Sequence, residues 1–144
     1  MKATLLIVDD EKNQREMLGR YLRKKGYEVH LASSGIEALN IIRENTIEIV
    51  ITDQKMPEMN GLELAAKIKE NHPNISIVII TAYGSIQDAV RAMKTNVEDY
   101  LTKPINLEEL DIILTKILKY YIEDLLVLLI MMLLEKNLQE NLRY

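Results

Sequence analysis

Short apolar runs alternate along the chain with longer stretches in which apolar positions recur at helical spacing. The runs that fit strands cover residues 5–8, 27–31, 47–51, 75–80 and 97–101, and the helical stretches cover 12–25, 35–45, 61–71 and 85–95. Strands that alternate with helices in this way are typical of βαβ units. The pattern therefore predicts an α/β fold with an open, doubly wound, five-stranded parallel sheet.

Charged and hydroxyl side chains follow four of the predicted strands. Asp9 and Asp10 come after the first strand, Asp53 after the third, Thr81 after the fourth and Lys103 after the fifth. In doubly wound sheets, ligands bind outside the carboxyl ends of the strands. Carboxylates held together repel one another unless a cation lies among them, and Mg²⁺ prefers carboxylates, waters and phosphate oxygens. The sequence therefore predicts a site for Mg²⁺ and a phosphoryl group at this edge of the sheet.

Composition narrows the class of protein. The 144 residues, 48% of them hydrophobic, suffice for one domain with an appendage. The net charge of −4 and the lack of a basic run disfavour direct nucleic-acid binding, which needs clustered Lys and Arg. The absence of Cys excludes disulfides and thiolate metal sites. The apolar run at the start is too short for a signal peptide, so we expect a cytoplasmic protein.

Four ordered motifs resemble those of a known family. They are VDDE after the first predicted strand, TDQKMPEMNG around Asp53, TAYG after the fourth strand and DYLTKP at the fifth. Together they resemble the receiver domain of bacterial two-component response regulators, over about residues 4–119. The stretch TAYGSIQDAVRAMK and the tail are similar to the NtrC group. The resemblance implies a flavodoxin-like (CheY-like) fold and a role in phosphorelay signalling, with transcription regulation as the output in the full-length family.

The resemblance also implies roles for the acidic residues. Asp53 would accept a phosphoryl group from a sensor histidine kinase or from a small donor such as acetyl phosphate. Asp10 and Asp53 would bind Mg²⁺ directly, together with the backbone carbonyl of Lys55, and Asp9 would act mainly through a bound water. The chain would catalyse only its own phosphoryl transfer and dephosphorylation, so we do not expect an enzyme that acts on an external substrate.

Further roles follow from the same resemblance. Lys103 would contact the phosphoryl oxygens, and Thr81 would donate its hydroxyl to one of them. Thr81 and Tyr100 would form the switch, with helix 85–95, strand 97–101 and the last helix as the output face. The Lys103–Pro104 peptide bond is typically cis in the family, and an X-Pro bond makes this possible.

Each residue also has an ordinary structural explanation. Asp9 and Asp10 would form a helix N-cap pair, and Thr81 would cap the next turn. Lys103 would be a surface charge and Tyr100 a half-buried strand aromatic. The placement of the acid pair, Asp53 and Lys103 at neighbouring strand ends favours the functional interpretation.

Two other classes of protein, and one variant of the receiver interpretation, remain as alternatives. A Mg-dependent aspartyl phosphohydrolase of the haloacid dehalogenase type needs a second acid two residues after the nucleophile, where this chain has Lys55. A flavodoxin-like nucleotide binder needs a phosphate loop after the first strand, where this chain has DDE. The third alternative is a receiver fold that serves only as a phosphorylation-independent dimerisation scaffold.

The tail is the least ordinary part of the sequence. Apolar residues at helical spacing fit a final helix over 106–119, and ten consecutive apolar residues follow at 125–134. A membrane span needs about 18 or more, so we predict no membrane helix. A helix that is apolar all round must be buried on several sides. We therefore divide the chain into a receiver domain, 1–119, and a helical extension, 120–144, that forms a homodimer or higher oligomer. EKNLQENL resembles the end of the coiled-coil linker in NtrC-type relatives, and no ATPase or DNA-binding motif follows it.

Overall fold

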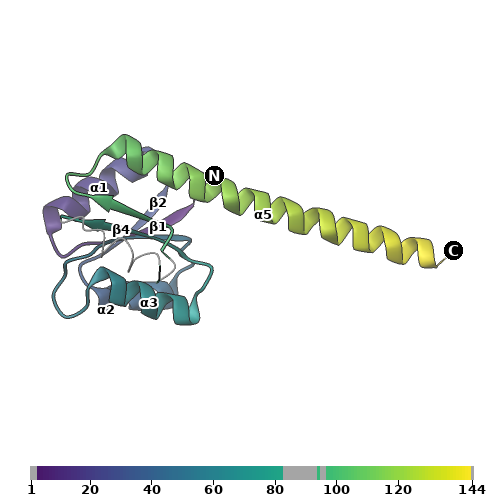
Figure 1. Ribbon diagram of the computed structural model, residues 1–144, viewed down its shortest axis with the longest axis horizontal. Helices are drawn as coiled ribbons and strands as arrows, with labels where there is room; N and C mark the ends of the chain where they lie inside the picture. Colours follow the sequence, from purple (N-terminus) through teal and green to yellow (C-terminus); the bar gives the residue numbers. More distant parts are fainter. Residues whose placement is uncertain (1–2, 83–93, 95–96, 144) are drawn as a thin grey trace. The chain divides into compact units, whose positions relative to one another are not determined.

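A five-stranded parallel sheet forms the centre of the fold (Figure 1). The computed structural model describes residues 3–82, 94 and 97–143. Neighbouring strands follow the order β2-β1-β3-β4-β5. Their bounds are β1 Thr4–Val8, β2 Glu28–Ala32, β3 Ile49–Asp53, β4 Ser76–Thr81 and β5 Asp99–Thr102. The predicted doubly wound sheet is thereby confirmed, and its strand order reverses at β1, between β2 and β3, where such sheets bind ligands.

The strand boundaries differ from the predicted ones by one or two residues. The run of apolar residues placed the third strand at 47–51, whereas β3 runs from Ile49 to Asp53. Asp53 belongs to the ladder because it pairs with Ile80 of β4. Polarity locates the buried part of a strand, but backbone pairing continues through polar residues and decides where the strand ends.

Three helices in the first part of the chain agree closely with prediction. They are α1 (Lys12–Lys24), α2 (Gly35–Glu44) and α3 (Gly61–Asn71). Gly26 follows α1 with a φ of 98°, a left-handed conformation that ends the helix. The predicted helix over 85–95 lies outside the described residues. Helix α1 covers one face of the sheet, while α2 and α3 cover the other (Figure 1).

The core between the sheet and helices α2 and α3 is built from aliphatic side chains, with no Phe in the chain. Alternate strand residues point to this face, as the period of two along a strand requires. Five of them are fully buried: Leu6, Val8, Val50, Ile77 and Ile79. This packing fixes the strand ends relative to one another, and so the positions of the residues that follow them.

The start of α3 is tied to the end of β3. Asn60 and Glu63 form a reciprocal capping box at the helix N-terminus. The Gly61 amide donates to the Gln54 carbonyl at 2.9 Å, and the Leu62 amide donates to Gln54 Oε1 at 2.9 Å. A Cβ at Gly61 would lie 2.6 Å from the Asp53 carbonyl oxygen. Only glycine therefore allows the helix to approach the backbone of β3 this closely.

The last helix, α5, runs without interruption over Leu107–Leu142. By contacts, the chain divides into two compact units, Met1–Leu107 and Glu108–Tyr144. Within α5, the residues Leu110, Ile113, Leu114 and Ile117 are buried, and residues 122–143 are all exposed. The division at residue 119 stays a prediction. Among the described residues, no helix combines the length and apolarity needed to cross a membrane.

Replacing Gly61 with Ala should destabilise the fold, because the new methyl group would collide with the carbonyl of Asp53. We expect Gly61→Ala to lower the free energy of unfolding by about 1–3 kcal/mol, measured by urea denaturation. Gly19→Ala is the matched control, since its Cβ meets only the end of the Leu31 side chain at 3.0 Å. A loss of the same size in both variants would contradict the assigned role of Gly61.

Candidate functional site: an acidic cluster at the carboxyl end of the sheet

Three carboxylates that are distant in sequence meet at the carboxyl ends of β1 and β3. Asp9 and Asp10 directly follow β1, and Asp53 is the last residue of β3. One carboxylate oxygen from each lies within 4.8 Å of the others. Asp9 and Asp53 are each only 8% exposed, whereas Asp10 is exposed. The predicted clustering of these three acids is therefore observed.

Backbone hydrogen bonds hold Asp9 on the β1 side of the cluster. Its amide donates to the Ala32 carbonyl at 3.1 Å, which extends the pairing of β1 with β2. Its Oδ1 accepts a hydrogen bond from the Glu11 amide at 2.9 Å. Arg15 Nη1 donates to the Asp9 carbonyl at 2.8 Å. These contacts fix both the backbone and the carboxylate orientation of Asp9.

Asp53 is held by its neighbours in the sheet and by the start of α3. The Gln54 amide donates to the Ile80 carbonyl at 2.8 Å, so β3 stays paired with β4 beyond Asp53. At the start of α3, Gly61 lies so close to the Asp53 carbonyl that a Cβ would not fit between them. Sequence reasoning overlooked Gln54, whose backbone and side-chain oxygens both anchor α3. The sequence did contain a signal for this role. Gln54 carries an amide side chain and lies between Asp53, at the end of a strand, and the Asn60–Gly61 start of the next helix.

Lys103 brings a positive charge to the buried acid. Its Nζ lies 3.4 Å from Asp53 Oδ2, with 19% of the Lys103 side chain exposed. The Lys103 amide donates to the Thr81 carbonyl at 2.7 Å, which places the residue just beyond the pairing of β4 with β5. The Lys103–Pro104 bond is cis, as the family resemblance implied.

The remaining predicted residues occupy different environments. Thr81 is buried at the end of β4, close in the fold to the backbone of Lys103. Tyr100 is partly buried on β5 and packs against the aliphatic core. Lys55 is exposed in the loop after β3, and the role of its carbonyl as a metal ligand stays a prediction. Residues 83–93, which include most of the predicted output helix, lie outside the described part of the chain.

Burial and like charge raise the pKa of two of the carboxyl groups. For Asp9, loss of hydration is the largest cause, the Glu11 amide opposes it, and the charge of Asp53 adds to it. For Asp53, loss of hydration again comes first in raising the pKa, and the Lys103 ammonium opposes it. Both groups are therefore harder to ionise than an ordinary aspartate, because the Lys103 ammonium does not offset the loss of hydration and the like charge.

The donor set fits a hard divalent cation. It consists of carboxylate oxygens alone, without the His or Cys ligands that select zinc or copper. The acids are close enough to share one ion, and a cation among them would offset the burial and the like charge that raise the pKa of Asp9 and Asp53. Mg²⁺ keeps several waters and binds one or two carboxylates together with phosphate oxygens, which matches two nearly buried acids with the exposed Asp10 and a lysine beside them.

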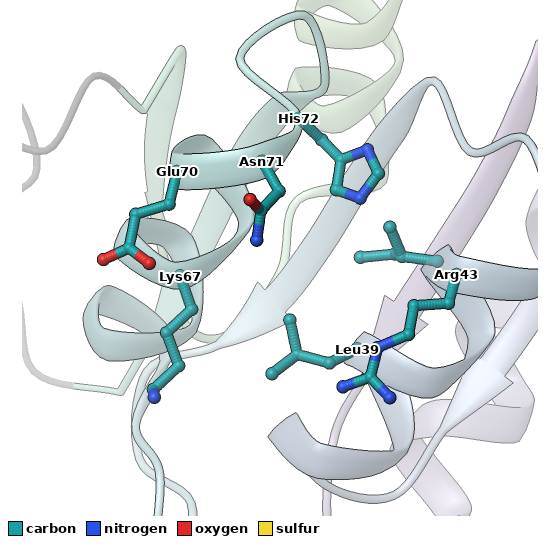
Figure 2. A pocket seen from close by; sticks show the side chains of 7 residues that line it. Leu39, Arg43, Lys67, Glu70, Asn71 and His72 are labelled. Carbon is teal, nitrogen blue, oxygen red and sulfur yellow. The ribbon is translucent and has the colours of Figure 1, made fainter.

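A larger cavity lies away from the acids, between α2 and α3 (Figure 2). It measures about 210 Å³, and Figure 2 shows Leu39 and Arg43 on the α2 side and Lys67, Glu70 and His72 on the α3 side. Both helices end here, so the cavity is at the amino ends of the strands, opposite Asp53. A cavity of about 10 Å³, the size of one water, is lined by Asp9 and Asp53 together with mostly apolar side chains. The acidic cluster is therefore separate from the cavity between α2 and α3.

Comparison with known proteins agrees with this geometry. The sequence profile of the response regulator receiver domain matches residues 5–115. This chain belongs to the response regulator receiver domain family. Receiver domains are phosphoacceptor signalling domains of two-component systems, which sensor kinases phosphorylate and which generally bind Mg²⁺ at an acidic pocket. No enzyme family is indicated.

Several relatives of this receiver domain are named as transcriptional regulatory proteins. It is 39% identical over 119 residues to the transcriptional regulatory protein ZraR of Klebsiella oxytoca, covering 83% of this chain and 27% of that protein. It is 41% identical over 108 residues to the transcriptional regulatory protein GlrR of Escherichia coli K12, covering 75% of this chain and 24% of that one. The chain thus spans about a quarter of the length of these curated relatives.

Solved structures are similar over the same region. A response regulator receiver domain protein from Clostridium thermocellum superposes with a TM-score of 0.79 at 35% identity, over 87% of this chain and 99% of that one. A response regulator receiver protein from Pseudomonas putida gives 0.76 at 30% identity, over 81% of this chain and 98% of that one. Sequence and structure therefore identify the same domain.

Neutralising Asp9 should stabilise this receiver domain when no divalent cation is present. Because the folded state raises the pKa of Asp9, it binds that proton more tightly than the unfolded chain, and stability falls as pH rises above about 4. We expect Asp9→Asn to raise the free energy of unfolding at pH 7 by about 1 kcal/mol, a few degrees in Tm, with a smaller difference at pH 4. Thermal unfolding in a chelator measures this.

Glu16→Gln, at an exposed position of α1, is the control for the loss of one negative charge. It should change Tm little at either pH. Added Mg²⁺ should then stabilise the parent protein more than Asp9→Asn, because binding to the folded state adds to its stability. A variant that is less stable than the parent at pH 7 in chelator would refute the argument from crowded charge.

Proposed function

We propose that Asp53 is the phosphoacceptor of this receiver domain and takes its phosphoryl group from a sensor histidine kinase. The observation that carries this proposal is the pairing of Asp53 with Lys103 at 3.4 Å, beside the carboxylates of Asp9 and Asp10. A carboxylate that attacks an anionic phosphoryl group is repelled by it, so it needs positive charge nearby to offset that repulsion. Asp53 is the carboxylate of the cluster that has this ammonium partner.

The transfer forms one bond and breaks another. A carboxylate oxygen of Asp53 bonds to phosphorus, and the bond from phosphorus to the donor breaks with its electron pair leaving on the donor. Lys103 then exchanges its carboxylate contact for the phosphoryl oxygens, as a compact cation on a flexible stem can do. Thr81, buried at the end of β4, supplies a hydroxyl donor to one of those oxygens.

The acidic cluster would hold Mg²⁺ through Asp10 and Asp53, with the carbonyl of Lys55 as a further ligand and Asp9 acting through water. When bound, Mg²⁺ neutralises charge on the phosphoryl oxygens and on the carboxylates. Asp9 and Asp10 also keep the cluster anionic, so that it selects a divalent cation. The hydrogen bond from the Glu11 amide to Asp9 Oδ1 at 2.9 Å keeps one of these carboxylates oriented.

Phosphorylation would be read out through the fourth and fifth strands. Thr81 would move toward the phosphoryl group and Tyr100 would turn inward behind it, which gives the two-state element that a signal requires. The exposed second half of α5 would associate with other copies of the chain. Control of transcription, the activity named for the relatives, would then belong to the whole regulator.

The chemistry is tested by the intact mass of the protein after incubation with acetyl phosphate. We expect one added phosphoryl group, which requires Mg²⁺ and disappears in Asp53→Ala. Asp53→Asn, which keeps the shape of the side chain, separates loss of the nucleophile from loss of packing. A folded protein that gains no phosphoryl group under any condition would refute the proposal and favour a phosphorylation-independent dimerisation scaffold.

Removing Lys103 should slow the reaction without preventing Asp53 from being the acceptor. We expect Lys103→Ala to lower the rate of phosphorylation by about 100-fold, because one preorganised charge that stabilises the transition state is lost. Lys103→Arg should recover part of the rate, since its charge remains but its planar group fits differently. Lys67→Ala, an exposed lysine of α3, is the control and should react like the parent. A Lys103→Ala rate within twofold of the parent would exclude this role.

A further inference from the structure

The second half of α5 is apolar on every side. Residues 125–134 are ten consecutive apolar residues, and each is between 48% and 65% exposed. Successive residues in an α-helix are rotated by about 100°, so ten in a row cover the whole circumference. Monomeric proteins rarely expose apolar patches larger than a few hundred Å². This segment therefore needs partners on more than one side.

One face of the segment carries a seam with the spacing of helix pairing. The first seam consists of Val127, Met131, Leu134, Leu138 and Leu142, at intervals of four, three, four and four residues. All five are more than half exposed. Intervals of three and four keep apolar side chains in one stripe along the helix, as at the a and d positions of coiled coils. The first seam fits one partner helix.

The opposite face carries another seam. The second seam consists of Ile122, Leu126, Leu129 and Leu133, at intervals of four, three and four. Leu133 and Met131 are two residues apart, which places the two seams about 200° from each other around the helix. The second seam ends where Lys136 and Glu140 occupy the same face. A helix that covers the first seam cannot also cover the second.

The apolar surface is large enough for a stable interface. An exposed aliphatic side chain presents roughly 60–120 Å² that burial would remove from water, so ten present about 600–1,200 Å². A stable interface takes about 800 Å² from each partner. A two-stranded coiled coil buries only two positions in seven, so in a dimer most of the segment, including the whole second seam, would stay in water.

We propose that α5 packs against at least two other copies of α5, one on each seam, so that the chain assembles with more than two copies. The heptad-like spacing of both seams identifies the partner as a helix with matching seams. Every copy of this chain supplies such a helix, and in a symmetric assembly each copy uses the same surfaces as the others. The inference rests on the self-association proposed above and specifies the number of copies that assemble.

The test is the mass of the full chain in solution, by sedimentation equilibrium or light scattering over a range of concentrations. We expect at least three times the chain mass of 16.6 kDa. The double variant Leu126→Lys, Leu129→Lys should fall to a dimer, because the second seam is lost and the first remains. Gln139→Lys adds a lysine about 100° around the helix from either seam and should keep the mass of the parent.

The outcomes separate this inference from the earlier proposals. If the parent protein is a dimer, the proposed contact at the second seam is wrong, but self-association through α5 still holds. If the parent protein is a monomer, both the second contact and self-association are wrong. A second-seam variant with the mass of the parent would also overturn the assignment of that seam. Each variant is checked by circular dichroism and by phosphorylation of Asp53, which depends on neither seam and shows that the receiver domain is folded.

Discussion

The repulsion among three carboxylates in a small space is the constraint on which this receiver domain depends. Asp9 and Asp53 are almost buried, Asp10 lies beside them, and one ammonium at 3.4 Å from Asp53 offsets part of the charge. The raised pKa of both buried acids reflects first the loss of hydration on burial and then the like charge of neighbouring carboxylates. A site of this kind gains stability whenever positive charge enters it, which suits it to a metal ion and to phosphoryl chemistry.

Rigid surroundings are needed to hold such a site together. The pairing of β3 with β4 continues through Asp53 to Gln54, and Gln54 accepts two hydrogen bonds from the first turn of α3. Gly61 lets that helix approach within van der Waals contact of the Asp53 backbone. On the other strand, the Glu11 amide fixes the carboxylate of Asp9. The aliphatic core under the sheet supplies the energy that keeps these ends in place despite their repulsion.

A different constraint applies to the last helix, because exposing its apolar side chains to water is unfavourable. Its first third has buried positions at helical spacing, and its second half has none, although it is the more apolar part. Two seams on opposite faces explain why the apolar residues are continuous instead of following one heptad stripe. The acidic cluster and the two seams share no residue, so substitutions can test phosphoryl chemistry and assembly separately.

The sequence by itself determined the order of strands and helices, the bounds of α1, α2 and α3 to within a residue, and the polar residues that follow each strand. These are local properties, because side-chain period and polarity depend on neighbours in the chain. The tertiary structure alone decided that Asp53 belongs to the sheet ladder, that Gln54 anchors α3 and that Lys103 reaches Asp53 at 3.4 Å. Those facts depend on the register of β3, β4 and β5, which long-range backbone pairing sets and local pattern does not encode.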